Sequence, residues 1–380
     1  MEMSRIRIWA TALSLILVFV RPTAAETPPP RFQVDAKAAV LLDATSGQIL
    51  FEQNATTRFP PASLAKLMTI YLAYDALEVG SVRPNDLVSI SQHASSMGGS
   101  QIFLQAGDRV RFIELLQGLA VASGNDAAIA LAEHLAGFRA AFVAQMNAKA
   151  KELELNDTRF QNPNGLPVQD QFSTAWDMAF LALHLIRDHP AALQLNSEKT
   201  FEYRGIRQHN RNRLLWKDSR VNGLKTGWLE EAGYHIVATA KEDDRQLIAV
   251  VLGAGSERGR EEIALRLLNY GFKNFHNVQF FAKGDRVKNL PVWKGTDNLI
   301  GVVAKEPGTV TIKNGNPQPT LAYQLPEKLI APIPAGQKVG EALITEEGRE
   351  ITRVDLVAMT TVPQAGFLKR FLHSLLLLFY

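Results

Sequence analysis

Two residues near the start of a helix-like segment have side chains that could perform acyl transfer. Ser63 is followed three positions later by Lys66, at the head of a run whose apolar residues recur at helical spacing. Residues three apart lie on one face of a helix, so the Ser63 hydroxyl and the Lys66 amine can meet. A hydroxyl beside an amine is a nucleophile beside a base. The alternative is a serine that caps a helix and a lysine in solvent, and this pair alone leaves both readings open.

A second polar group, Ser123-Gly124-Asn125, separates two segments that we expect to be helices, 111–122 and 126–136. A tripeptide of this kind is often a connector whose side chains satisfy their own backbone. The functional alternative places the Ser123 hydroxyl and the Asn125 amide in a cleft.

A third group, Lys225-Thr226-Gly227, ends a predicted strand over 221–227. A glycine in a strand allows a ligand to approach the backbone closely, although the same string also suits an ordinary strand end. A basic stretch over 205–213 that includes Arg211 is either a solvated loop or an anion site.

The elements that must position these groups follow from hydrophobic periodicity. We expect two strands at 38–42 and 49–52 and a hairpin formed by 234–240 and 246–252. Further helices are predicted at 140–155, 174–188 and 261–270. The segment 91–109 is rich in Ser and Gly, which favours a mobile loop that either rims a site or only connects elements.

The composition limits the function classes. The chain has 380 residues, a formal net charge of +3 and no cysteine. The small net charge argues against a dedicated nucleic-acid binder. The missing cysteines exclude cysteine nucleophiles, thiolate metal sites and disulfides, and they are compatible with an oxidising compartment.

The two ends of the chain predict export and a membrane contact. Residues 1–25 have a charged start with Arg5 and Arg7, an apolar core over 8–20 and small residues before Glu26, as in a cleaved signal peptide. Gly366–Tyr380 separates polar and apolar residues at helical spacing but is too short to span a bilayer. We expect it to lie in the membrane surface with its basic side towards anionic headgroups. The alternative is a terminal helix packed on the preceding domain.

These observations predict four regions. A signal peptide (1–25) precedes a catalytic domain (26–281). A β-rich domain (282–363) follows, because short strand-like runs there alternate with turn residues. An amphipathic helix (364–380) would hold the protein on the periplasmic face of the inner membrane, with the β-rich domain as a stalk.

Serine-x-x-lysine, serine-x-asparagine and lysine-threonine-glycine in this order are the motif set of penicillin-binding proteins and class A β-lactamases. The chain resembles the D-alanyl-D-alanine carboxypeptidases, the low-molecular-mass penicillin-binding proteins, over nearly its whole mature length. The shared strings are 62–69, 123–127, 210–212 and 223–227. One departure is Trp228, where this family often has His.

The resemblance implies an α/β (α+β) fold, with an antiparallel sheet flanked by helices and then a small all-β domain. It implies that Ser63 attacks the bond between two terminal D-alanines of a peptidoglycan stem peptide, giving an acyl-enzyme. It further implies that Lys66 is the base, that Ser123 relays a proton and that Lys225 supplies a positive field. Asn125 would bind the substrate's amide, and Thr226 and Arg211 would bind its terminal carboxylate. The oxyanion hole would use the backbone N–H groups of Ser63 and of Trp228, which follows Gly227. The implied mechanism requires no metal or cofactor. β-Lactams are expected to acylate the same serine. The implied biological role is in peptidoglycan maturation and cell shape.

Three rival functions share this scaffold. A serine β-lactamase of class A would use a glutamate in an E-x-x-L-N string, and 152–156 reads that way. We discount Glu152 because it ends the predicted helix 140–155 and follows Ser123 too soon. A transpeptidase differs only in the acyl acceptor and stays open, and a non-catalytic wall-binding protein is disfavoured by the intact motifs.

Overall fold

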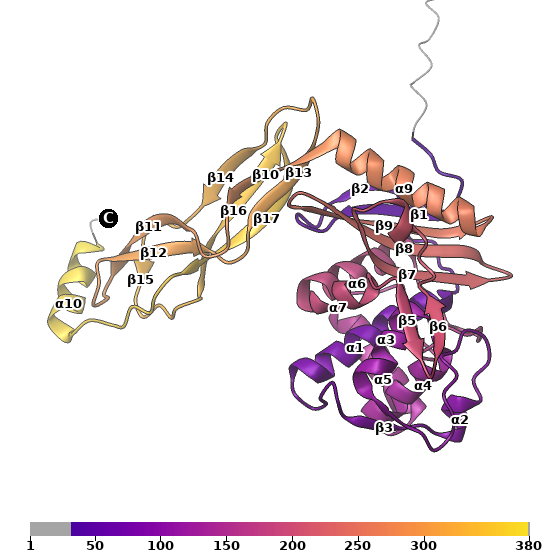
Figure 1. The fold of residues 1–380 in the computed structure, drawn as a ribbon. Helices are drawn as coiled ribbons and strands as arrows, with labels where there is room; N and C mark the ends of the chain where they lie inside the picture. The colour runs from indigo at the N-terminus through magenta and orange to yellow at the C-terminus, as the bar shows by residue number, and fades with distance from the viewer. Residues whose placement is uncertain (1–31, 379–380) are drawn as a thin grey trace, which may run out of the picture. The chain divides into compact units, whose positions relative to one another are not determined.

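The computed structural model describes residues 32–378 (Figure 1), so the predicted signal peptide lies outside the described residues. The chain divides into two compact units, Met1–Gln33 and Val34–Tyr380. Of the first unit, only Phe32 and Gln33 are described.

A five-stranded antiparallel sheet forms the centre of the catalytic region, in the order β2-β1-β9-β8-β7. Its strands are β1 (Ala38–Asp43), β2 (Ile49–Gln53), β7 (Val221–Leu229), β8 (Gly233–Glu242) and β9 (Arg245–Ala254). Every residue of β1 is buried, as expected for a strand covered on both faces. The predicted antiparallel sheet is confirmed, with strand ends that extend one or two residues beyond the expected ones.

Helices cover this sheet on two sides (Figure 1). On one side lies α9 (Glu257–Asn274), which begins four residues before the predicted start because the Ser256 hydroxyl caps it by accepting the Gly259 N–H. The other side carries the larger helical group, whose main members are α1 (Lys66–Glu78), α3 (Phe112–Val121), α4 (Asn125–Ala136), α5 (Arg139–Glu152) and α6 (Ala175–Asp188).

The main core lies between the sheet and these helices. The first residues of α1 and α4 are buried almost all round, which is wider burial than the single apolar stripe expected for α1. Small alanines on α4 allow neighbouring elements to pack closely. The buried starts of these two helices therefore place Lys66 and Asn125 inside the protein.

Short elements complete the catalytic region. They include α2 (Gln92–Ser95), α7 (Ala191–Asn196), α8 (Leu214–Lys217) and the pairs β3–β4 (Leu87–Ser89 with Arg109–Arg111) and β5–β6 (Thr200–Tyr203 with Ile206–His209). The last hairpin was not predicted from the basic stretch at 205–213. It ends at His209 and leads directly into Arg211.

The β-rich region has a six-stranded sheet, in the order β14-β16-β17-β12-β11-β15, and a separate pair, β10 with β13. The strands are β10 (Phe275–Phe281), β11 (Arg286–Trp293), β12 (Leu299–Ala304), β13 (Gly308–Lys313), β14 (Thr320–Gln324), β15 (Leu329–Ile330), β16 (Lys338–Glu346) and β17 (Arg349–Ala358). Because β10 pairs with β13, the β-rich region begins at Phe275 rather than at the expected residue 282.

The described chain ends in the helix α10 (Phe367–Leu376). Its polar side contacts the β-rich region: Lys369 Nζ donates to the Thr296 carbonyl at 3.0 Å, and His373 Nδ1 accepts the Lys294 N–H at 2.8 Å. The apolar side chains on the other side remain exposed. This orientation differs from the expected one, in which the basic side would face headgroups.

Within residues 32–378, no single helix is long and apolar enough to cross a membrane. When α4 and α5 are counted as one bent helix, the pair has sufficient length and apolar composition for such a span.

Candidate active site

Ser63 lies in a single 3-10 turn, Ala62–Ala65, directly before α1. The sequence predicted that Ser63 and Lys66 share one helical face, and the structure confirms the contact with a different local geometry. In a 3-10 turn, side chains three residues apart are eclipsed, so the two side chains stand directly above one another. The Lys66 Nζ atom is 2.8 Å from the Ser63 Oγ atom.

Lys66 is completely buried, and its amine has two further partners. It donates to Asn125 Oδ1 at 2.7 Å and to the backbone carbonyl of Asn164 at 2.6 Å. A neutral amine has two N–H groups and one lone pair. If the two carbonyl oxygens take both N–H groups, the lone pair points at the Ser63 hydroxyl, which is the arrangement of a general base.

The surroundings of Lys66 favour this neutral form. Burial lowers the pKa of Lys66 well below its usual value, the positive charge of Lys225 lowers it further, and the carboxylate of Asp126 opposes the shift. That carboxylate is occupied by backbone N–H groups of Ile102, Leu104 and Ala127. Asp126 therefore acts mainly as the anchor of the loop before α3.

Ser123 is held in a sparsely populated conformation next to the same site. Its φ of 61° lies in the left-handed region, which is uncommon for a residue other than glycine. The side chain is buried, and Ser123 Oγ has no hydrogen-bond partner among residues 32–378. A buried hydroxyl held by a strained backbone and lacking a partner is a functional candidate.

Asn125 connects Lys66 to the glycine-rich segment. Its Nδ2 donates to the Gly98 carbonyl at 2.7 Å, and its backbone N–H donates to the Ser100 carbonyl at 2.7 Å. Ser100 also lines the pocket that contains Ser63. Of the two alternatives for segment 91–109, the structure supports the one in which it rims the site.

Lys225 and Thr226 lie on β7, the edge strand of the sheet. Lys225 is buried, and its Nζ donates to the Thr226 carbonyl at 3.0 Å. Burial, with the nearby cations Arg260 and Arg211, lowers the pKa of Lys225 to about 7. The site therefore contains two buried amines, both shifted towards neutrality.

At Gly227, β7 passes very close to the turn that carries Ser63. A Cβ atom at position 227 would lie 3.1 Å from the Ala62 Cβ and 3.3 Å from the Ser63 backbone nitrogen. Both distances are tighter than most Cβ contacts, so a side chain at position 227 would require its neighbours to shift by a few tenths of an ångström. The next backbone N–H along β7, that of Trp228, consequently belongs to a strand that lies close to the backbone of Ser63.

The pocket in front of these groups has a volume of about 380 Å³. Arg211 and Trp228 are exposed on its wall. The lining comprises Ser63, Ser100, Ser123, Arg211, Thr226, Gly227, Trp228, Tyr234, Glu257 and Arg260. All nine predicted site residues therefore converge here: six line the pocket, and Lys66, Asn125 and Lys225 are buried and linked to the lining residues through hydrogen bonds or charge.

Sequence reasoning missed several residues of this site. Arg260 on α9 is buried, donates to the Gly227 carbonyl at 3.3 Å and pairs with Glu257 at 3.0 Å. Asn164 supplies a carbonyl to Lys66, and Tyr234 stands 6.0 Å from Trp228, between ring centroids. The Asn162-Pro163-Asn164-Gly165 string was a visible turn signal, but nothing local in the sequence tied it to Lys66.

Glu152, the residue of the β-lactamase alternative, lies elsewhere. It ends α5, its side chain is 65% exposed, and it pairs with Lys149 at 2.9 Å. It is absent from the lining of the pocket that contains Ser63. A residue in this position cannot activate a water molecule at Ser63.

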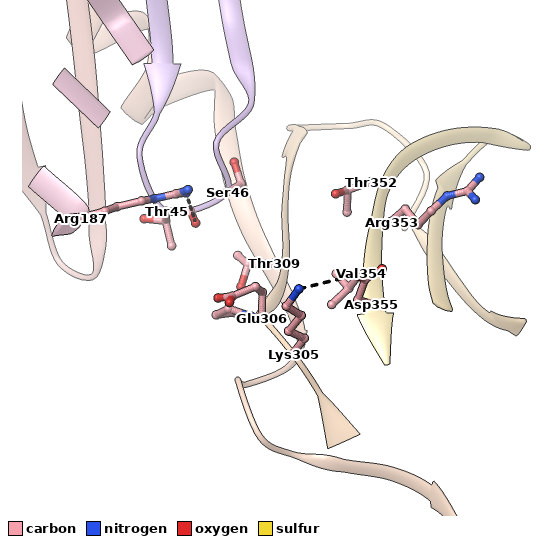
Figure 2. Close-up of a pocket in the computed structure, with 11 residues that line it drawn as sticks. Thr45, Ser46, Arg187, Lys305, Glu306, Thr309, Thr352, Arg353, Val354 and Asp355 are labelled. Atoms are coloured by element: carbon pink, nitrogen blue, oxygen red, sulfur yellow. Dashed lines mark hydrogen bonds and ion pairs between the residues drawn. The ribbon is translucent and has the colours of Figure 1, made fainter. Parts of the chain in front are cut away.

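A larger pocket, of about 710 Å³, contains none of the nine predicted residues (Figure 2). Its charged groups already have partners: Arg187 donates to the backbone carbonyls of Ala44 and Thr45, and Lys305 lies 3.7 Å from Asp355. The predicted site residues therefore gather at the smaller pocket and not at this one. Within residues 32–378, no group of three or more His, Asp or Glu side chains is placed to hold a metal ion.

Comparison with known proteins gives consistent matches along the chain. The family model described as D-alanyl-D-alanine carboxypeptidase matches residues 22–256, and the model described as penicillin-binding protein 5, C-terminal domain, matches residues 275–364. D-alanyl-D-alanine carboxypeptidase DacC of Escherichia coli is 40% identical over 94% of this chain and 92% of its own length. DacF of Bacillus subtilis is 35% identical over 88% and 87%.

Solved structures agree with these matches. Penicillin binding protein 5 from Haemophilus influenzae superposes with a TM-score of 0.81 at 36% identity, over 90% of this chain and 100% of that one. Penicillin-binding protein D2 from Listeria monocytogenes, in its ampicillin-bound form, gives a TM-score of 0.59 at 31% identity over 64% of this chain and 99% of its own.

Proposed function

The chain belongs to the D-alanyl-D-alanine carboxypeptidase family of serine peptidases, and we propose that Ser63 is the nucleophile with which it removes the terminal D-alanine of peptidoglycan stem pentapeptides. The observation that carries this assignment is the set of three contacts made by Lys66. A buried amine with two carbonyl acceptors and a lone pair towards a serine hydroxyl has the geometry of a base poised for that serine.

In the first step, Lys66 takes the Ser63 proton as Ser63 Oγ attacks the carbonyl carbon between the two D-alanines. The negative charge then moves to the carbonyl oxygen, and two backbone N–H groups, those of Ser63 and Trp228, form its oxyanion hole. The close approach of β7 to the Ser63 turn at Gly227 supports this pairing. Because the second donor is a backbone group, a Trp in place of His at position 228 leaves it intact.

The substrate's terminal carboxylate is received by hydrogen-bond donors in the lining of the pocket. Thr226 and Arg211 were expected in this role, and we add Arg260, which lines the same pocket with its guanidinium beside the Gly227 carbonyl. A guanidinium suits a carboxylate because it offers parallel N–H donors. Asn125 is assigned to the substrate amide.

The leaving amine needs a proton, and Ser123 is placed to relay it. Its hydroxyl is buried at the pocket, and Lys225, whose pKa is about 7, holds positive charge nearby for part of the time at neutral pH. Collapse of the tetrahedral intermediate breaks the amide bond and releases D-alanine. Water then hydrolyses the ester on Ser63, and no step requires a metal or cofactor.

The experiment that tests the nucleophile uses labelled penicillin, since the β-lactam amide resembles the D-alanyl-D-alanine bond. The label should map to Ser63, and Ser63→Ala should abolish labelling and D-alanine release together. Labelling of another residue would show that the mechanism is wrong. Product analysis with an added amine acceptor separates the transpeptidase alternative, because only a transpeptidase forms a cross-linked product.

We also propose that the mature protein works on the periplasmic face of the inner membrane, attached through α10. Its six exposed apolar residues support this: Phe367, Leu368, Phe371, Leu372, Leu375 and Leu376. An amphipathic helix of this kind binds in the plane of a membrane surface. The signal-peptide pattern at residues 1–25 supports export, and the β-rich region would serve as the stalk.

A further inference from the structure

His235 is a fully buried histidine on β8 that belongs to none of the three sequence motifs. Both of its ring nitrogens contact the backbone. The Gly253 N–H donates to Nδ1 at 2.9 Å, and Nε2 lies 3.2 Å from the Pro60 carbonyl oxygen. One side chain thus connects β9 to the segment that precedes Ser63.

These two partners determine where the ring carries its proton. A backbone N–H can only donate, so Nδ1 must present its lone pair to Gly253. A carbonyl oxygen can only accept, so Nε2 must carry the proton that goes to Pro60. The ring is therefore neutral and in a single tautomer whenever both hydrogen bonds exist.

The charges around the ring agree with this protonation state. The two charged groups that act on it are cations: Arg260 from α9 and Lys37 from the segment before β1. Burial, assisted by these cations, lowers the pKa of His235 to about 4, while the contacts to Pro60 and to the backbone of Tyr234 oppose the shift. At neutral pH both hydrogen bonds are retained.

The position of His235 in the sheet relates it to both halves of the oxyanion hole. His235 lies directly opposite Gly227 in the β7–β8 register, and Gly227 immediately precedes Trp228 in the chain. Its other contact, Pro60, stands three residues before Ser63. The ring therefore joins the strand that supplies one backbone donor to the segment that supplies the other.

We infer that His235 is a positioning residue that fixes the backbone N–H groups of Ser63 and Trp228 at the spacing an oxyanion requires. This inference rests on the function proposed above. It predicts that loss of the ring's contacts slows the chemical step rather than substrate binding, because misplaced oxyanion donors weaken the transition state selectively.

The test compares variants at this position in the full-length protein. His235→Leu keeps the bulk but removes both hydrogen bonds, whereas His235→Asn offers one amide donor and one carbonyl acceptor. The matched control is Thr239→Val, on the same strand as His235, which removes the hydrogen bond from the buried Thr239 hydroxyl to Asn222 on β7. The readouts are kcat and KM for D-alanine release from a pentapeptide and the acylation rate constant with a fluorescent penicillin, each normalised to folded protein by circular dichroism.

We expect His235→Leu to lower kcat and the acylation rate constant by about 10- to 100-fold with KM within twofold. His235→Asn should recover most of the rate, and Thr239→Val should keep the wild-type rate. If His235→Leu does not fold, His235→Ser, which leaves room for water but cannot reach Pro60, should show the same loss.

A folded His235→Leu or His235→Ser protein with the wild-type rate constant would overturn the inference, as would equal losses in the Leu and Asn variants. Failure of the proposed function is a separate result. In that case the wild-type protein itself would release no D-alanine, or the penicillin would label a residue other than Ser63.

Discussion

The Lys66 amine donates a hydrogen bond of 2.6 Å to the backbone carbonyl of Asn164, a residue 98 positions away in the chain. The loop around Asn164 is fixed by its own side chains: Asn162 Oδ1 accepts the Gly165 N–H at 2.7 Å, and Thr69 Oγ1 donates to the Pro163 carbonyl at 2.7 Å. This loop therefore sets both the position of Lys66 and, through the packing of Gly165, that of Ser63.

The first prediction concerns Gly165. Its φ is 81°, and a Cβ atom there would overlap the carbonyl oxygen of Ala62, next to Ser63. Gly165→Ala should therefore displace the Ser63 turn and lower the acylation rate constant by at least 10-fold. The displacement should also reduce the thermal midpoint, measured by calorimetry.

Gly137→Ala provides the matched control, since Gly137 has a φ of 77° and a Cβ there would meet nothing within 4 Å. It shares the backbone strain, worth about 1 kcal/mol, without the overlap. Equal acylation rates in the two variants would show that the loop does not position Ser63.

The pH dependence of acylation provides the second prediction. Below the pKa of Lys66 the amine holds a third proton and cannot accept one from Ser63, so the acylation rate should fall as the pH falls. The charge of Lys225 lowers the pKa of Lys66. Lys225→Gln should therefore raise that pKa and move the acid limb of the acylation profile to higher pH.

This shift is measured from the acylation rate constant with a fluorescent penicillin between pH 5 and 9. Because the pKa of Lys225 is itself about 7, the effect should be largest below pH 7, where Lys225 is charged. Lys217→Gln, which removes a cation paired with Glu261 and absent from this pocket's lining, should leave the limb in place. An acid limb that does not move in Lys225→Gln would contradict the role of Lys225.

The sequence predicted most of the catalytic region because its strands and helices carry strong local patterns. The buried strands β1, β8 and β9 are continuous apolar runs bounded by turn residues, and these were found within two residues of their observed ends. The strand β14 was missed because most of its residues are exposed, so it has no alternation to detect. The strand β10 has mostly half-buried residues and was missed for the same reason.

The site was predictable only where a motif carried it. Ser63 and Lys66 are three residues apart, so their contact follows from helical geometry alone. The Asn164 carbonyl, Arg260 and His235 reach the site from distant segments, and no local periodicity reports such a contact. Neither the 3-10 turn at Ser63 nor the left-handed backbone of Ser123 has a local signal either, because both are imposed by the packing around them.

The third prediction concerns stability at low pH. The pKa of His235 is about 4 in the folded protein and near the usual 6.5 when unfolded, so the unfolded chain binds the proton more readily. Its contribution to stability is present above pH 6.5 and is lost as the pH falls towards 4. The total loss is about 3 kcal/mol.

Urea unfolding of the wild type and of His235→Asn between pH 7.5 and 4.5 measures this contribution. The free energy of unfolding of the wild type should fall more steeply with decreasing pH, because the variant has no titrating group there. Parallel curves for the two proteins would show that His235 does not remain neutral in the fold.

The last prediction concerns α10 and separates its two sides. Phe371 and Leu372 are about half exposed on the apolar side, whereas His373 on the polar side accepts the Lys294 N–H and contacts the Trp293 ring edge-to-face. If the apolar side enters the membrane, Phe371→Asp with Leu372→Asp should abolish co-sedimentation with vesicles that contain anionic lipid, because burying charge in the acyl boundary is unfavourable. His373→Ala should weaken the contact with the β-rich region but keep the binding to these vesicles.

Truncation after Pro363 should release the protein into the soluble fraction with unchanged activity on small peptides, as none of the removed residues lines the pocket of Ser63. A truncated or doubly substituted protein that still sediments with vesicles, or that unfolds, would exclude α10 as the anchor.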